Sequence, residues 1–153
     1  MHKRAFQAAT FAVLIATGPA LAGTIAPADV KINDMAVTQA LTGTAGAPVA
    51  GREVFADRKL GNCLACHVNS EQAEQPFHGE IGPPLDGVAD RWGAAELRAI
   101  IIDSKAIFGD QTIMPGFYTL DVGARVAEDF QGKTILSAQD VEDVLAYLLT
   151  LKE

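Results

Sequence analysis

The chain has 153 residues, of which 49% are hydrophobic, and its formal net charge at pH 7 is −7. That length fits one compact domain with an extension. The acidic balance argues against nucleic acid or an anionic membrane surface as a partner.

The first 22 residues have the pattern of an export signal. Basic residues from His2 to Arg4 are followed by a mostly apolar run over 8–17, and Ala20 to Ala22 forms an Ala-Leu-Ala cleavage site before Gly23. We expect residues 1–22 to be a signal peptide whose removal leaves a periplasmic chain, more acidic than before and without a membrane span. The alternative is a retained N-terminal membrane anchor.

Residues 23–48 are rich in Ala, Thr, Gly and Pro and show weak periodicity. This composition predicts an irregular arm, either a flexible lead-in or a segment that packs across the domain or a partner. The domain proper then spans 49–153. It opens with a helical face formed by Gly51, Val54 and Phe55.

The sequence Cys-Leu-Ala-Cys-His at 63–67 indicates covalent attachment of haem c, because this motif after an export signal is typical of that site. The Cys63 and Cys66 thiols can add to the two haem vinyl groups, and the His67 imidazole can reach the iron. A zinc site with His78 as fourth ligand would have an unusual spacing. A redox dithiol would need a βαβ setting, and a plain disulfide would leave His67 unexplained. Haem attachment uses both cysteines of the chain, so no thiol remains for sulfur chemistry.

After the motif, Gly and Pro residues predict a loop over 69–90. A helix is expected over 94–103, where Leu97, Ile100 and Ile101 form an apolar stripe. A loop carrying Met114 follows. Residues 117–136 show no firm pattern apart from a short helix near 122–129.

The last helix has the clearest pattern. Ser137 to Asp140 resembles a capping box with Asp in place of Glu. Glu142 and Asp143 are expected on the face away from the core. The core-facing positions at helical spacing are Val141, Val144, Leu145, Leu148 and Leu151. Three or four helices with long loops predict an all-α domain in which one buried haem acts as the core.

Met114 is the candidate for the second axial ligand. Pro115 biases it toward an extended conformation on a loop, and its thioether would favour ferrous iron. Core packing is the ordinary alternative for a methionine. His78 and Met35 are the other candidate ligands in the mature chain.

The turn around Gly82 and Pro83 is a candidate support for His67. A ligand histidine donates its second ring N–H to a fixed acceptor, and the Pro83 carbonyl suits that task. The alternative is a turn without such a role. Arg91 and Trp92 are candidates for a haem propionate contact, although a solvated arginine fits equally well.

With these motifs in this order, residues 49–153 resemble a class I cytochrome c. In that family the first and last helices cross. Here Gly51 and Phe55 match the contact positions of the first helix, and Val144 and Tyr147 match those of the last. The resemblance implies a class I cytochrome c fold around one covalently bound haem c, preceded here by the irregular arm.

In several motifs the chain looks like a member of the SoxX family. The segments that carry this similarity are Gly61 to His67, Ile81 to Val88, Met114-Pro115 and Gly132 to Leu148. The resemblance implies a monohaem electron-transfer subunit that forms a periplasmic heterodimer with SoxA, and this heterodimer is an L-cysteine S-thiosulfotransferase. That complex joins thiosulfate to a cysteine of the SoxYZ carrier, and electrons pass from the SoxA haem through SoxX to a small cytochrome c. The sulfur chemistry belongs to SoxA.

Two other functions remain open from the residues. One is a free periplasmic class I cytochrome c that carries electrons without an obligate partner. The other is a gas-binding haem protein, which requires an open axial position on the iron.

Overall fold

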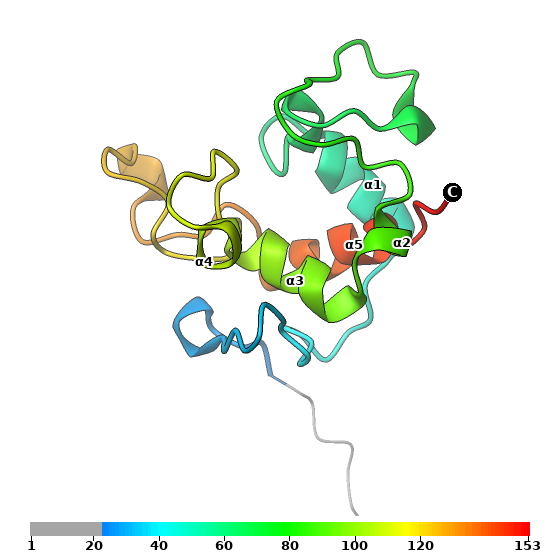
Figure 1. Cartoon of the computed structure of the whole chain (residues 1–153). Coiled ribbons are helices and arrows are strands. Elements are labelled where there is room, and N and C mark those ends of the chain that lie inside the picture. Colours follow the sequence, from blue (N-terminus) through cyan, green and yellow to red (C-terminus); the bar gives the residue numbers. More distant parts are fainter. Residues whose placement is uncertain (1–22) are drawn as a thin grey trace, which may run out of the picture.

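The computed structural model describes residues 23–153, so the expected signal peptide lies outside the described residues. The described chain is helical, and its only bridge of β type is an isolated pair between Asn33 and Ala36. The α-helices are α1 (Pro48–Ala56), α2 (Val88–Arg91), α3 (Ala94–Ile102), α4 (Ser104–Phe108) and α5 (Ala138–Leu148). Four single 3₁₀ turns lie at Pro27–Asp29, Cys63–Ala65, Ser70–Gln72 and Glu128–Phe130. The all-α expectation is confirmed, and Figure 1 shows α1, α3 and α5 gathered at the centre with long loops around them.

Helices α1 and α5 pack against each other through their backbones. A Cβ atom added at Gly51 would lie 1.9 Å from the carbonyl oxygen of Asp143, so only glycine permits this approach. Beside this contact, the rings of Phe55 and Tyr147 meet edge to face with centroids 5.4 Å apart. The first and last helices therefore meet at the positions that the cytochrome resemblance indicated.

The start of α5 is fixed by a local capping box. The Asp140 backbone N–H donates to Ser137 Oγ over 3.1 Å, and the Ser137 N–H donates to Asp140 Oδ2 over 2.9 Å. The predicted box is confirmed. The apolar positions of the helix are buried: Val141, Val144, Leu145 and Leu148.

The expected exposure of Glu142 and Asp143 is wrong, because their side chains lie under the arm. Glu142 is only 5% exposed and Asp143 only 8%. Glu142 Oε1 accepts the Leu41 N–H, and Asp143 Oδ1 accepts the Ala47 N–H, each over 2.8 Å. The second face of α5 is thus covered by chain that precedes α1.

The arm therefore packs across the domain and does not form a flexible lead-in. Val37 and Leu41 are buried in the core. The Val37 N–H donates to the Ala95 carbonyl, and the Ile25 N–H donates to the Leu41 carbonyl, which closes the arm on itself. In Figure 1 the arm, blue to cyan, runs along the lower side of α3.

Two helices expected from the sequence also differ in the structure. The helix expected over 94–103 ends at Ile102, because Asp103 caps α4 by accepting the N–H groups of Lys105 and Ala106. The short helix expected near 122–129 is wrong, since that segment contains only the start of a 3₁₀ turn at Glu128–Phe130. No helix among residues 23–153 has the length and apolar character needed to cross a membrane.

Candidate haem site

The Cys-Leu-Ala-Cys-His motif forms one tight turn. Asn62 enters it in the left-handed region at φ 48°, and the N–H groups of Cys66 and His67 both donate to the Cys63 carbonyl. Both cysteine residues are half-buried, and their sulfurs are not joined to each other. Burial raises the pKa of the Cys63 thiol to about 12, so this group is a neutral thiol at ordinary pH. The turn brings both sulfurs and the imidazole into a single short segment.

The His67 ring is held by the turn that follows. Its Nδ1 lies 2.7 Å from the Pro83 carbonyl oxygen. A carbonyl only accepts, so Nδ1 carries the proton and Nε2 keeps its lone pair for a metal. The backbone at Gly82 lies against the ring, because a Cβ there would be 2.4 Å from His67 Cε1. The chain alone therefore fixes both the tautomer and the orientation that a ligand histidine needs.

Backbone hydrogen bonds tie the motif to the segment 79–85. The Gly82 N–H donates to the Cys66 carbonyl, and the Gly79 N–H donates to the Leu64 carbonyl, each over 2.8 Å. A Cβ at Gly79 would lie 2.0 Å from the Ala65 carbonyl oxygen, so this second glycine also packs directly on the motif. From the sequence, Gly79 is one of the glycines in the loop expected over 69–90, and its position after His78 gives no sign of this contact.

Arg91 braces the same turn. Its guanidinium donates to the carbonyls of Pro84 and Asp86 over 2.8 Å and 2.7 Å. Trp92 packs edge to face against Phe108, with ring centroids 6.1 Å apart. The arginine thus supports the segment that carries Pro83, a role that the sequence pattern did not suggest.

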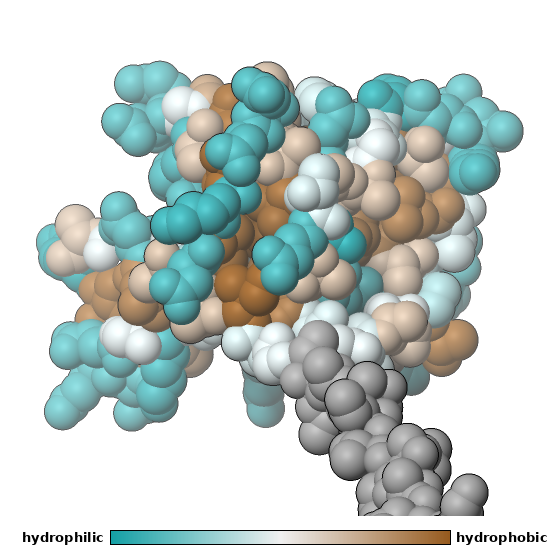
Figure 2. All heavy atoms as spheres, turned by 90° about the horizontal axis from the view of Figure 1, so that it is seen from below, coloured by the Kyte–Doolittle hydropathy of each residue, from teal (hydrophilic) through white to brown (hydrophobic). Residues whose placement is uncertain are grey.

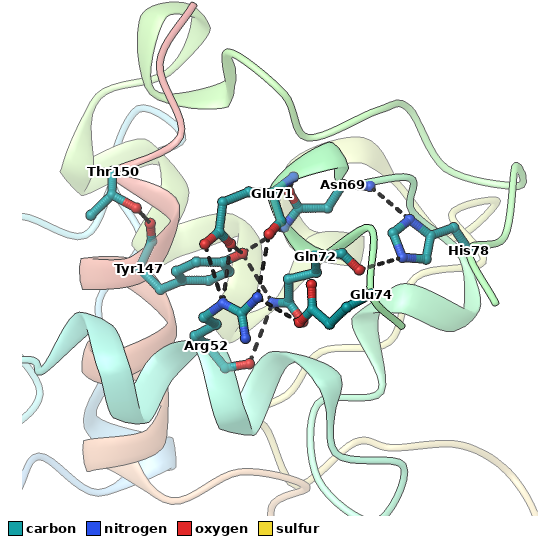
Figure 3. Close-up of polar contacts among 8 residues, drawn as sticks. All are labelled: Arg52, Asn69, Glu71, Gln72, Glu74, His78, Tyr147 and Thr150. Atoms are coloured by element: carbon teal, nitrogen blue, oxygen red, sulfur yellow. Dashed lines mark hydrogen bonds and ion pairs between the residues drawn. The ribbon is translucent and has the colours of Figure 1, made fainter. Parts of the chain in front are cut away.

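A polar network around Tyr147 fixes the loop that leaves the motif (Figure 3). The hydroxyl accepts from Asn69 Nδ2 over 2.7 Å and from Gln72 Nε2 over 2.9 Å, and it donates to the Glu71 carboxylate. Burial, followed by the contact with Glu71, raises the pKa of Tyr147 to about 12. Arg52 on α1 pairs with the same carboxylate. The crossing of α1 and α5 is in this way connected to residues two to five positions beyond His67.

The structure does not assemble the alternative zinc site. His78 lies on the far side of this network, where its Nδ1 accepts the Asn69 N–H and its Nε2 faces the Gln72 carbonyl at 3.1 Å (Figure 3). Both ring nitrogens are thus engaged with the protein. Among residues 23–153, no group of three or more His, Cys, Asp or Glu side chains is placed to hold a metal ion.

Met114 lies on a loop that is anchored to α3 and α4. The side chain is half-buried at the edge of the core. The Phe117 and Tyr118 N–H groups donate to the Ile101 and Ile102 carbonyls at the end of α3. The methionine is therefore presented from a braced loop.

Several large apolar side chains on these loops remain exposed in the chain alone. Ile81 precedes the turn on which His67 rests, and Ile113 precedes Met114. A flat apolar macrocycle linked at the motif would cover such exposed apolar side chains, so the residues present fit a covalent haem. Figure 2 views the molecule from the side of the arm, where apolar surface also lies between hydrophilic side chains.

Comparisons with known proteins agree with this reading. The family model described as cytochrome c matches residues 48–152, and the chain belongs to that family, which implies a covalently attached haem c.

Among solved structures, the chain is similar to a chain in the crystal structure of SoxXA from P. pantotrophus. The two share 42% sequence identity with a TM-score of 0.79, and the match covers 86% of this chain and 100% of that chain. The SoxX-type resemblance seen in the motifs is confirmed by this match. No curated protein sequence is similar to this chain at a significant level.

Proposed function

We propose that the chain carries one haem c, joined by thioether bonds to Cys63 and Cys66 and held axially by His67 and Met114. The bound group would supply one-electron exchange between ferric and ferrous iron. The observation that carries this assignment is the His67 ring, which is oriented by the Pro83 carbonyl with Nε2 left available.

Each protein group has a distinct part in this site. The Pro83 carbonyl makes the imidazole a better donor to the metal by accepting its Nδ1–H. The Met114 thioether favours the reduced metal and so raises the reduction potential. Because both ligand segments are tied to the fold by hydrogen bonds, little rearrangement would accompany a change of oxidation state.

With both axial positions taken and both thiols in thioether bonds, the chain itself has no group for sulfur chemistry. We therefore propose that it is the monohaem electron-relay subunit of a SoxXA-type complex in the periplasm, exported by removal of residues 1–22. In this proposal it takes electrons from a SoxA subunit as thiosulfate is joined to the SoxYZ carrier cysteine, and passes them to a small cytochrome c. The match to the SoxXA chain over its whole length supports this role.

The axial assignment is tested by Met114→Ala in the holoprotein. We expect loss of the ferric charge-transfer band that marks a thioether–iron bond, and carbon monoxide binding to the reduced protein. Met35→Ala is the matched control, because that methionine lies exposed in the arm. Retention of the band in Met114→Ala would contradict the assignment, because another group would then be bonded to the iron. Absence of the band from the wild-type protein, together with carbon monoxide binding, would favour the gas-binding alternative.

The relay assignment is tested by co-purification. A relay subunit should elute with a larger haem-containing partner, and the isolated complex should reduce a small cytochrome c when given thiosulfate and the SoxYZ carrier. A haem-loaded chain that elutes alone from its native source would instead favour the free electron carrier.

A further inference from the structure

We infer that the junction of α3 and α4 is a clamp that fixes the methionine loop, and that Ser104 is the positioning residue for Met114 within it. This inference rests on the proposed ligation by Met114. It concerns a residue that would not itself touch the metal.

The Ser104 hydroxyl is committed to the methionine loop. Ser104 is 0% exposed, and its Oγ lies 2.6 Å from the Met114 carbonyl oxygen and 3.4 Å from that of Pro115. Both acceptors therefore belong to the segment that would present the ligand. Asp103 caps α4 at the preceding position, which fixes the first turn of the helix and with it the direction of the hydroxyl.

The same junction holds the loop on both flanks of Met114. Before the methionine, Lys105 Nζ donates to the carbonyls of Asp110 and Thr112. After it, the Phe117 and Tyr118 N–H groups donate to the last carbonyls of α3. Ser104 acts between these flanks, at the ligand residue itself.

There is also little free space beside the loop. A Cβ added at Gly116 would lie 2.5 Å from Thr119 Cγ2 and 3.0 Å from the Ile102 carbonyl oxygen. The backbone on the C-terminal side of Met114 thus rests directly against the end of α3. Close packing at Gly116 and the hydrogen bonds of Ser104 and Lys105 thus act on the same loop.

This restraint matters because a thioether is a weak ligand that competes with added ligands and with water. A loop held in place keeps the sulfur at high effective concentration near the metal. If the Ser104 contact is removed, the free-energy gap between the attached and the detached state of Met114 shrinks by the net contribution of that hydrogen bond. An external ligand that captures the detached state should then bind more tightly.

The test is a titration of the ferric Ser104→Ala holoprotein with imidazole. Binding is monitored through the loss of the charge-transfer band. We expect the apparent affinity for imidazole to rise about fivefold, the factor that one ordinary hydrogen bond is worth. We also expect a lower reduction potential and faster hydrogen exchange at the Phe117 and Tyr118 amides. Thr150→Ala is the control, since it removes a hydroxyl-to-carbonyl contact of the same 2.6 Å length at the end of α5.

The outcomes separate this inference from the proposed function. Wild-type protein without the band would overturn ligation by Met114 and the clamp with it. A wild-type band combined with equal imidazole affinity in Ser104→Ala and Thr150→Ala would overturn the clamp alone. If Ser104→Ala does not accumulate as holoprotein, Lys105→Met probes the other flank, where an unchanged imidazole affinity would equally reject the clamp.

Discussion

The Tyr147 hydroxyl offers a sharp test of how the loop after the motif is held. Tyr147→Phe keeps the ring and its edge-to-face contact with Phe55 but removes one oxygen. That oxygen is the acceptor for the side-chain amides of Asn69 and Gln72, both of which are fully buried. The substitution therefore leaves two buried donors without this acceptor.

The expected cost follows from those two donors. A buried polar group that loses its partner costs about 1–3 kcal/mol. Gln72 Nε2 keeps a long contact of 3.4 Å to the Arg52 carbonyl, so the cost at Gln72 lies at the low end of this range. We expect the free energy of unfolding to fall by about 2–4 kcal/mol, well above the ~1 kcal/mol of an ordinary substitution.

The assay is urea unfolding of the ferric holoprotein, with Tyr118→Phe as the matched control. Tyr118 is also a buried tyrosine, but its hydroxyl makes one hydrogen bond, to the Ile25 carbonyl over 2.7 Å. We expect Tyr118→Phe to cost about 1 kcal/mol. Equal losses in the two variants, or a loss below about 0.5 kcal/mol in Tyr147→Phe, would refute the reasoning that places the loop under the control of this hydroxyl.

Three further outcomes are expected from the same structure. The pKa of Tyr147 is raised from 10.0 to about 12, so the folded state favours the neutral phenol. The stability that the neutral phenol contributes is present below pH 10 and is lost as the pH rises through about 12. The urea midpoint should therefore fall more steeply above pH 10 in the wild-type protein than in Tyr147→Phe. Arg98→Met should lower the free energy of unfolding by about 3–5 kcal/mol, since Glu142 would keep a buried carboxylate without the partner that now contacts it over 2.8 Å and 3.0 Å; a loss under 1 kcal/mol in urea would count against a buried pair. Gly51→Ala should cost about 3 kcal/mol or more, or prevent accumulation of holoprotein, because its Cβ meets α5 backbone that cannot rotate away; a wild-type melting temperature would show that the helices are not in contact there.

Features encoded over a few residues were predictable from the sequence. The capping box at Ser137 and the stripe of α5 depend on neighbours three or four positions apart, and both are present in the structure. The end of α3 was misplaced by one residue, although Asp103 before Ser104 is itself a local capping signal that could have marked the start of α4.

Features that depend on distant parts of the chain were not predictable in the same way. The helical pattern of α5 predicts that the acids at 142 and 143 face away from the core, because it identifies one apolar face and nothing local indicates that a second face will be covered. The partner of Glu142 is Arg98 on another helix, and the segment that buries it is the arm. Likewise, Asn69 and Gln72 belong to a loop without a distinctive local pattern. They are buried, and both contact the side chain of Tyr147, which is more than 70 positions away in the sequence.

The pairing of arm and α1 with α5 has a consequence for the order of assembly. The Leu41 amide donates to the Glu142 carboxylate, 101 positions further along the chain. Gly51 packs against the backbone of Asp143 on the same helix, α5. Until α5 is available, α1 lacks the helix on which Gly51 packs, and the Leu41 and Ala47 amides lack the carboxylates that accept them. Contacts of such long range form late. We expect the sulfurs at 63 and 66, where haem attachment is proposed, to stay accessible during that interval, before α1 packs on α5.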